Sequence, residues 1–246
     1  MTLLLPGKRI MVTGAASGIG AAVALVAAEA GASVIVADLD DDGARAVAAS
    51  LPGTDHIALS LDVASGQSVA SAMAEVRARG DVLDALIHSA GIWKFGKDGA
   101  VTDVDDETWA QTIAVNLTGT FLVCRAAVPL LERSGAGAIV TIASVAALAG
   151  FERTTAYAAS KGGVVALSRV MALDLAPRNI RVNCLCPGVV ETELTREALS
   201  HRVPRLPIGR LGKPVDIART AIFLASEWAG FTTGTVQVVD GGFVAT

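Results

Sequence analysis

Seven short apolar runs recur along the 246-residue chain, and alanine-rich segments of helical length separate most of them. The runs are rich in β-branched residues and cover 9–14, 33–38, 56–62, 83–91, 138–144, 180–186 and 235–242. Strands that alternate with helices indicate βαβ units and a parallel sheet. Because the runs are continuously apolar, we expect helices to cover both faces of that sheet. The predicted fold class is therefore α/β, with a doubly wound parallel sheet.

The composition limits the classes of function. No linker, repeat or low-complexity segment interrupts residues 1–246, so we expect a single domain. The formal net charge is −4 and no basic stripe is present, which argues against a nucleic-acid partner. Three cysteines give no disulfide framework, and together with three scattered histidines they suggest no metal site. We therefore expect a cytoplasmic protein without a metal.

Neither the N-terminus nor the longest uncharged stretch indicates a membrane protein. The first ten residues contain too short an apolar run for a signal peptide. The uncharged stretch 134–151 is broken by glycine and hydroxyl residues, which indicates loop and buried strand rather than a membrane span. We therefore expect no membrane partner.

The first predicted strand ends in a glycine-rich turn, TGAASGIG at 13–20, which also opens the next helix. Its glycines allow the backbone to approach a pyrophosphate, and the helix N-terminus offers N–H groups and the positive end of the helix dipole. Glycines also serve helix packing in α/β proteins, so the turn alone is weak evidence. Its place at the first strand–helix junction strengthens the prediction of nucleotide binding.

Asp38 ends the second predicted strand, 24 residues after Gly14. An acid at this place can accept hydrogen bonds from both hydroxyls of an adenosine ribose. The acidic run 40–42 is interpreted as a cap of the following helix. Asp62, at the end of the third strand, either contacts an adenine amino group or caps the next helix.

Tyr157 is the only tyrosine of the chain, and Lys161 follows it four residues later. Residues at this spacing lie on one face of a helix. A phenol has an unperturbed pKa of about 10, and a nearby ammonium favours its phenolate. The pair therefore suits a general acid/base whose pKa Lys161 lowers. A surface lysine beside a half-buried tyrosine is the alternative for an isolated pair of this kind.

Two further residues are candidates for the same site. Ser144 ends the fifth predicted strand. Asn116 lies between apolar residues of a long helical region, where an amide is costly unless it is hydrogen-bonded. A buried structural role is the ordinary explanation of such an asparagine. Pro129 is expected to bend or end this helix.

The glycine-rich turn, Asp38, Asn116, Ser144 and the Tyr157–Lys161 pair together resemble the short-chain dehydrogenase/reductase family, in its shorter, single-domain branch. The resemblance runs through VNCLCPG at 182–188 to VVDGG at 238–242. It implies a Rossmann-type sheet of seven parallel strands and a homotetramer.

The resemblance also implies a role for each matching residue. Tyr157 is similar to the catalytic acid/base, and Lys161 to the residue that lowers its pKa and holds the nicotinamide ribose. Ser144 resembles the serine that hydrogen-bonds the substrate oxygen, and Asn116 the asparagine that anchors a proton-relay water. The residues expected to bind the cofactor are Gly14, Ser17, Gly18, Ile19, Gly20, Asp38, Leu39, Asp62, Val63, Ser89, Ala90, Gly91, Tyr157, Lys161, Pro187, Gly188, Val190 and Thr192.

One motif departs from the family pattern. His88, Ser89, Ala90 and Gly91 stand where the family usually shows Asn-Asn-Ala-Gly. The last two residues are retained, so the backbone can still approach the cofactor, but the bracing of the central sheet must differ. His88 is expected to be a packed structural residue rather than a catalytic one.

The predicted function is an NAD(H)-dependent oxidoreductase that interconverts a secondary alcohol and a ketone. A 3-oxoacyl thioester reductase is the alternative, and a non-catalytic nucleotide sensor is less favoured. An epimerase or dehydratase of the family's extended branch needs a C-terminal region for which the chain has little room. NAD is favoured over NADP because a 2′-phosphate would meet the Asp38 carboxylate, with Ser17 and Leu39 offering no cation.

Residues 189–213 are predicted to form a lid over a small-molecule substrate, with a short helix at 193–200. Pro204, Pro207, Gly209 and Gly212 then interrupt regular structure. The substrate pocket is expected to be modest, with walls from Trp93, Ala146, Phe151 and Arg153. The lid carries a basic bias, for which a solvated surface is favoured over an anion site. Its basic residues are Arg196, His201, Arg202 and Arg205.

Overall fold

The computed structural model describes residues 4–201 and 205–245, which form one seven-stranded sheet in the order β3-β2-β1-β4-β5-β6-β7. Every neighbouring pair of strands is parallel. The strands are β1 (Arg9–Thr13), β2 (Ser33–Asp38), β3 (Ile57–Ser60), β4 (Ala85–His88), β5 (Gly137–Ile142), β6 (Ile180–Pro187) and β7 (Val236–Val239). Each falls on one of the seven apolar runs, so the predicted parallel sheet is confirmed.

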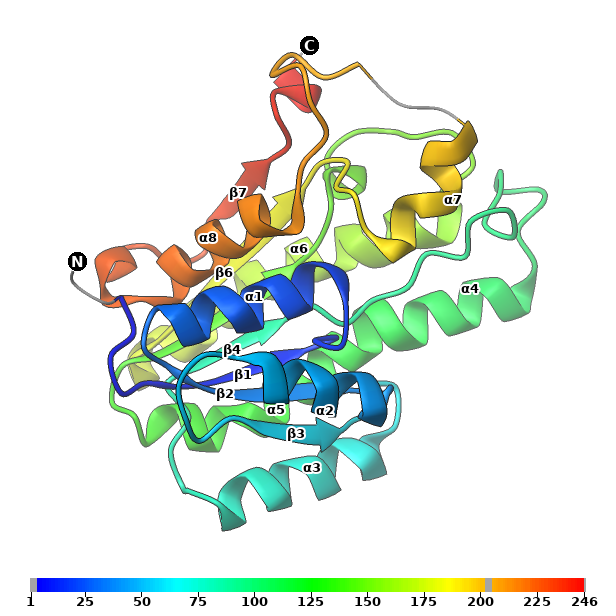
Figure 1. Cartoon of the computed structure of the whole chain (residues 1–246). Coiled ribbons are helices and arrows are strands. Elements are labelled where there is room, and N and C mark those ends of the chain that lie inside the picture. The colour runs from blue at the N-terminus through cyan, green and yellow to red at the C-terminus, as the bar shows by residue number, and fades with distance from the viewer. Residues whose placement is uncertain (1–3, 202–204, 246) are drawn as a thin grey trace.

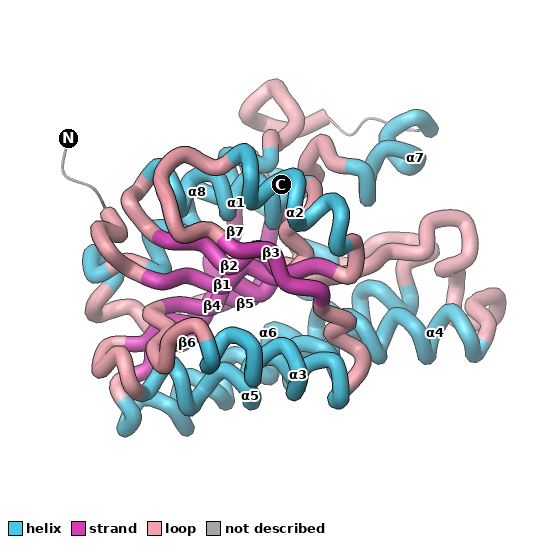
Figure 2. The backbone as a smooth tube through the Cα atoms, turned by 60° about the horizontal axis from the view of Figure 1, so that its bottom comes forward, coloured by secondary structure: helices cyan, strands magenta, loops and turns pink. Residues whose placement is uncertain are grey.

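Helices cover both faces of the sheet (Figure 2). On one face lie α1 (Gly18–Glu29), α2 (Asp41–Ser50) and α8 (Pro214–Ala225), and on the other α3 (Gly66–Ala78), α5 (Gly119–Glu132) and α6 (Thr155–Leu175). Successive strand residues point to opposite faces. Ile10 and Val12 of β1 accordingly join the core beneath α1 and α8, whereas Met11 joins the core beneath α3 and α5. This double burial is the reason for the continuous apolar runs.

A single helical stretch, Asp106–Glu132, combines α4 (Asp106–Ile113), a π-helical turn (Ala114–Thr118) and α5. Pro129 lies inside α5, which continues to Glu132, so this proline does not end the helix, and the alternative that it bends the helix stays a prediction. Within the described residues it is the one helix long and apolar enough to cross a membrane, with 44% of its apolar window buried. Core helices also meet that test, and α5 packs on the sheet.

Because all seven strands are parallel, their carboxyl ends meet at one edge of the sheet. The loops after β1, β4, β5 and β6 gather there, and α7 (Glu193–His201) stands beyond this edge, away from the sheet (Figure 1). The helix expected at 193–200 is therefore present. Short 3-10 turns complete the fold at Val145–Ala147, Ala176–Arg178, Glu227–Ala229 and Phe243–Ala245.

Candidate active site

The glycine-rich turn leaves the N-terminus of α1 open. Gly14 and Gly18 have φ angles of 63° and 56°, which favour glycine. A Cβ on Gly14 would lie 2.6 Å from the Cα of Ala90, so this turn and the loop after β4 pack backbone to backbone. Ser17 is the N-cap of α1 without a side-chain cap bond, and the first helical turn carries no acid. The unblocked N–H groups fit a phosphate of a dinucleotide.

Asp38 ends β2 beside this turn. Its Oδ2 accepts a hydrogen bond from the Ala16 N–H at 2.9 Å, and its Oδ1 accepts one from the Asp40 N–H at 3.0 Å. Each carboxylate oxygen retains a further acceptor site, so the fixed carboxylate fits a pair of ribose hydroxyls. Asp40 is the N-cap of α2 and accepts from the Gly43 N–H, as predicted for the acidic run.

The turn after β3 is stabilised by a hydrogen bond within it. Asp62 Oδ1 accepts from the Ala64 N–H at 2.9 Å, whereas the N-cap of α3 is Ser65. The expectation that Asp62 caps α3 is therefore wrong, and an adenine contact stays a prediction. Val63 is buried against Gly119, where a Cβ would lie 2.9 Å from a Val63 methyl carbon. Leu39, after β2, is exposed.

Helix α6 carries Tyr157 and Lys161 on one face. The Lys161 Nζ lies 5.8 Å from the centroid of the Tyr157 ring and donates to the carbonyl oxygen of Ile142 at 2.9 Å. Lys161 is only 4% exposed, so its ammonium is fixed at the end of β5. A Cβ on Gly91, in the loop after β4, would lie 3.1 Å from this Nζ. A side chain at this position would therefore crowd the ammonium, which favours glycine there.

Burial shifts the pKa values of both residues. It lowers the pKa of Lys161 from 10.5 to about 8. Burial also raises the pKa of Tyr157 above its ordinary value of 10, and the hydrogen bond with Ser144 opposes this only in part. For the chain by itself the pKa of Tyr157 is thus raised rather than lowered, because burial disfavours the phenolate, and the lowering by Lys161 stays a prediction.

Ser144 lies just beyond β5, which ends at Ile142 rather than at Ser144 as predicted. Its backbone begins the 3-10 turn Val145–Ala147, and its Oγ accepts from the Ala146 N–H at 3.1 Å. The side chains of Ser144 and Tyr157 share a hydrogen bond. Two hydroxyls from separate elements thus meet at one point, where they can hold a single substrate oxygen.

Asn116 is fully buried in the π-helical turn and holds the loop after β4. Its Oδ1 accepts from the Ile92 N–H at 2.8 Å, and its Nδ2 donates to the Ile92 carbonyl oxygen at 2.9 Å. The same Nδ2 donates to Ser160 Oγ of α6 at 3.0 Å. The amide therefore ties that loop to the helix of Tyr157, and its backbone carbonyl oxygen accepts from Thr120 Oγ1.

A carboxylate that the sequence reasoning missed caps the helix of Tyr157. Asp98 is 4% exposed, and its two oxygens accept from the N–H groups of Ala156 at 3.0 Å and Tyr157 at 2.9 Å. Thr154, the local N-cap, makes no side-chain cap bond. No local pattern reveals this cap, because Asp98 belongs to a loop 58 residues earlier in the chain.

His88 is a buried structural residue, as expected. Its Nδ1 lies 2.9 Å from Thr13 Oγ1, which also accepts from the Ala90 N–H at 3.3 Å. Burial, with the charge of Lys161 as a smaller cause, lowers the pKa of His88 to about 3. The imidazole is thus neutral and braces β1 against β4 in place of the family's asparagine.

Ser144, Tyr157 and Lys161 share a cavity of about 140 Å³ with the glycine-rich turn. Residues of the predicted cofactor set that also line it are Gly14, Ser17, Gly18, Ile19, Gly20, Ser89, Gly91, Pro187, Gly188, Val190 and Thr192. The remaining predicted residues do not line this cavity: Asp38 ends β2, Leu39 follows it, Asp62 and Val63 follow β3, and Ala90 lies in the loop after β4. The first turn of α7 (Glu193, Leu194 and Thr195) also lines the cavity, and these three residues were missed as site residues.

The predicted substrate residues divide into two groups. Trp93 lies beside Tyr157, with the two ring centroids 5.8 Å apart, and Ala146 contacts Ser144. Phe151 stacks on Phe243 of the C-terminal segment at 5.6 Å. The guanidinium of Arg153 lies 3.1 Å from Asp103 at the surface, so the structure does not bring it into the cavity.

The basic residues of the lid mostly lie at the surface. Arg196 pairs with Glu193 at 2.8 Å with both side chains exposed, and Arg205 is exposed. The His201 ring lies 5.6 Å from the Phe95 ring. Arg202 and Pro204 lie outside the described residues. These contacts favour the solvated-surface interpretation over an anion site.

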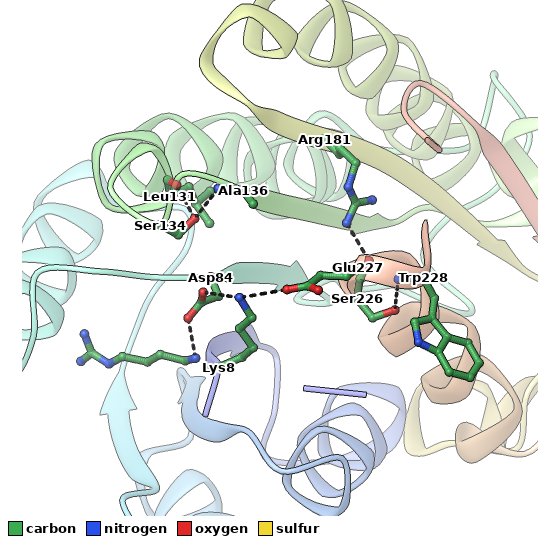
Figure 3. Close-up of polar contacts among 10 residues, drawn as sticks. Lys8, Asp84, Leu131, Ser134, Ala136, Arg181, Ser226, Glu227 and Trp228 are labelled. Atoms are coloured by element: carbon green, nitrogen blue, oxygen red, sulfur yellow. Dashed lines mark hydrogen bonds and ion pairs between the residues drawn. The ribbon is translucent and has the colours of Figure 1, made fainter. Parts of the chain in front are cut away.

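A larger cavity, of about 340 Å³, lies at the opposite edge of the sheet. Its charged side chains pair with one another or with the backbone (Figure 3). Lys8 lies 3.3 Å from Asp84 and 3.5 Å from Glu227, and Arg181 donates to the Ser226 carbonyl oxygen at 3.0 Å. Ligands of parallel sheets bind at the carboxyl ends of the strands, so the smaller cavity is the candidate site.

Cys124, Cys184 and Cys186 are free and buried. Among residues 4–201 and 205–245, no group of three or more His, Cys, Asp or Glu is placed to hold a metal ion.

Comparisons with known proteins agree with this geometry. The family profile described as enoyl-(acyl carrier protein) reductase matches residues 14–244. D-threitol dehydrogenase from Mycolicibacterium smegmatis is 41% identical over 97% of this chain and 94% of its own length. A 3-oxoacyl-(acyl-carrier-protein) reductase from Thermotoga maritima is 37% identical over 98% of this chain and 99% of its own length.

A solved structure shares the whole architecture. The crystal structure of a short-chain type dehydrogenase/reductase from Mycobacterium marinum superposes with a TM-score of 0.92 at 33% identity, over 100% of this chain and 98% of that one. Sequence and fold therefore agree over nearly the full length, and the chain belongs to the short-chain dehydrogenase/reductase family, whose dehydrogenases are oxidoreductases that use nicotinamide cofactors.

Proposed function

We propose that this chain is an NAD(H)-dependent oxidoreductase that interconverts a secondary alcohol and a ketone. The observation that carries the proposal is one cavity in which Ser144, Tyr157 and Lys161 meet the open N-terminus of α1. Bound NAD supplies the carbon that accepts or returns the hydride.

Side chains of the protein transfer the proton of the substrate hydroxyl and position the substrate oxygen. The Tyr157 phenolate takes the hydroxyl proton during alcohol oxidation, and the phenol so formed gives it back during ketone reduction. The Ser144 hydroxyl, already hydrogen-bonded to the phenol, holds the substrate oxygen. The buried ammonium of Lys161 favours the phenolate while the proton is away. Asn116 fixes the loop that contacts the glycine-rich turn, and a proton-relay water is proposed at this residue.

Asp38 supports NAD over NADP. Both of its oxygens are held by backbone N–H groups, so the carboxylate cannot turn away from a ribose 2′-position. A 2′-phosphate there meets a like charge, whereas a hydroxyl donates a hydrogen bond. The exposed Leu39 offers no compensating cation.

The direct test follows absorbance at the reduced-nicotinamide band with a panel of secondary alcohols and ketones. Turnover of simple alcohols with NAD supports the proposal. The alternative, a 3-oxoacyl thioester reductase, is favoured by the relative from Thermotoga maritima and predicts turnover of an acetoacetyl thioester instead. Nicotinamide binding without turnover of any alcohol, ketone or thioester would indicate a non-catalytic sensor and contradict both.

We further propose a cytoplasmic homotetramer in which residues 189–213 close over the substrate. Exposed large apolar side chains on α4, α5 and α6 need a partner surface, and they are Trp109, Phe121, Val170 and Leu173. Trp228 and Phe231 are also exposed. Light scattering at micromolar concentration tests the assembly, and a stable monomer contradicts it. The three reduced, buried thiols are compatible with a reducing compartment.

A further inference from the structure

The backbone of the loop carrying Trp93 is fixed on both sides of this residue. Before it, the Asn116 amide holds both backbone polar groups of Ile92, at 2.8 and 2.9 Å. After it, Asp98 accepts from the N–H groups of Ala156 and Tyr157. The loop is therefore tied at two points to the elements that build the candidate active site, and it holds Trp93 against them.

The indole of Trp93 lies at the catalytic tyrosine. Its ring centroid is 5.8 Å from that of Tyr157, with the planes tilted by 37°. On its other side the Phe95 ring lies 5.1 Å away in an edge-to-face arrangement, and Phe95 in turn contacts His201 at the end of α7. These aromatic rings form a continuous wall from the catalytic helix to the helix of the predicted lid.

The Nε1 of Trp93 is buried without a hydrogen-bond partner, and among the described side chains this holds for one other atom only, Nε2 of His88. The histidine has a simple explanation, because a neutral imidazole with its proton on Nδ1 leaves Nε2 as a bare nitrogen. An indole has no such alternative, since its nitrogen always carries a proton. A buried donor without a partner lowers stability, and such groups are retained where function requires them.

The indole packs directly on the Tyr157 ring. Under the proposed function the Tyr157 and Ser144 hydroxyls hold the reacting oxygen, so we place the missing acceptor on the same substrate, on a carbon near the reacting one. The indole is neutral, and Arg153, the cation predicted for this wall, is paired with Asp103. A second hydroxyl therefore fits better than a carboxylate.

We infer that the Trp93 N–H is a specificity-determining donor to a hydroxyl adjacent to the reacting carbinol, and that the substrates are vicinal diols or longer polyols. This inference rests on the proposed alcohol oxidation. It adds a substrate class and a residue that selects it.

The test uses the Trp93→Phe variant, which keeps an aromatic ring between Phe95 and Tyr157 and removes only the N–H and part of the ring. Matched substrates are the stereoisomers of 2,3-butanediol against 2-butanol, which share a carbon skeleton. The control variant is Trp109→Phe, on α4 and 41% exposed. Oxidation is followed as kcat/KM with NAD, and the melting temperature of each variant is recorded.

For the unmodified chain we expect at least one diol stereoisomer to exceed 2-butanol in kcat/KM. Trp93→Phe is expected to lower that preference about tenfold, which corresponds to about 1.4 kcal/mol. Oxidation of 2-butanol should fall less than oxidation of the diol, and the melting temperature should not fall, because an unpartnered donor is removed. Trp109→Phe should leave the preference unchanged.

Four results overturn the inference. An unmodified chain that prefers 2-butanol, or a variant with an unchanged diol preference, overturns it and leaves the proposed function intact. A preference for lactate over 1,2-propanediol shows that the second group is a carboxylate. Absence of turnover with every alcohol overturns the proposed function, and the inference with it.

Discussion

The carboxylate of Asp98 accepts a hydrogen bond from the backbone N–H of Tyr157 at 2.9 Å, and so caps α6 from a distant loop. Its other oxygen accepts from the Ala156 N–H. A side chain outside α6 therefore sets the start of the helix at the proposed acid/base, and the same loop carries Trp93.

Removal of this cap by Asp98→Ala is predicted to reduce both stability and turnover. The free energy of unfolding should fall by about 1–2 kcal/mol, because two N–H groups at a helix N-terminus lose their acceptor. Turnover should fall by roughly tenfold, because misplacement of a reacting group is costly. Denaturant unfolding and steady-state kinetics measure the two effects.

Asp105→Ala is the matched control for this experiment. Asp105 is the N-cap of α4 and accepts from the Thr108 N–H at 2.6 Å. Its loss should lower stability by a similar amount and leave kcat unchanged. If both variants change kcat equally, Asp98 has only a structural role.

The Tyr157 phenol is predicted to titrate above its ordinary pKa of about 10 in the protein without cofactor, because burial disfavours the phenolate. Tyr157 is the only tyrosine, so phenolate absorbance reports this one group. The Tyr157→Phe variant should show no transition in the same titration. A midpoint well below 10 would mean that the Lys161 charge outweighs burial.

Lys161→Met is predicted to be more stable than the unmodified chain at pH 7. The unfolded chain keeps this lysine proton up to about pH 10.5, whereas burial lowers the folded pKa to about 8. Below pH 8 both states are protonated, and burial of the charge lowers the free energy of unfolding by about 3 kcal/mol at ~1.36 kcal/mol per pKa unit.

The stability difference should therefore shrink as the pH rises from 8 to 10.5, because there the unfolded state binds more protons than the folded one. Urea unfolding at several pH values measures it. Lys8→Met, which removes the pairs of Lys8 with Asp84 and Glu227, is the control and should gain no stability. A Lys161→Met variant that is less stable at pH 7 contradicts the account of a desolvated ammonium.

Asp38→Ser is predicted to shift cofactor preference towards NADP. Loss of the carboxylate removes the repulsion of a 2′-phosphate, so the ratio of kcat/KM for NADP over NAD should rise by roughly tenfold or more. Asp41→Ala removes a nearby surface acid that pairs with Arg45, and should leave the ratio unchanged. An unmodified enzyme that prefers NADP would contradict the role given to Asp38.

The features that the sequence predicted depend on local patterns. Continuous apolar runs that alternate with helical segments predict a sheet buried on both faces. Each of the seven strands lies on one of these runs. The spacing of Tyr157 and Lys161 likewise reports one helix face. These signals need only neighbouring residues.

The features that it did not predict depend on contacts between distant residues. Asp98 reaches the N-terminus of α6 across 58 positions, and the π-helical turn at Asn116 has no distinct periodicity of its own. The rise of the Tyr157 pKa in the chain by itself was not predicted, because burial is a property of the whole fold. Asp62 was one predicted cap of α3, whereas in the structure the N-cap is Ser65. The path of the loop decides which of the two residues directly precedes the helix.

Tyr157→Phe tests the central claim most directly, because it removes the transferable proton and keeps the ring against Trp93. Absorbance at the reduced-nicotinamide band gives turnover with a secondary alcohol, and calorimetry gives the affinity for NAD. The account predicts a fall in kcat of about 100-fold or more with NAD binding retained. Turnover close to that of the unmodified enzyme would contradict it.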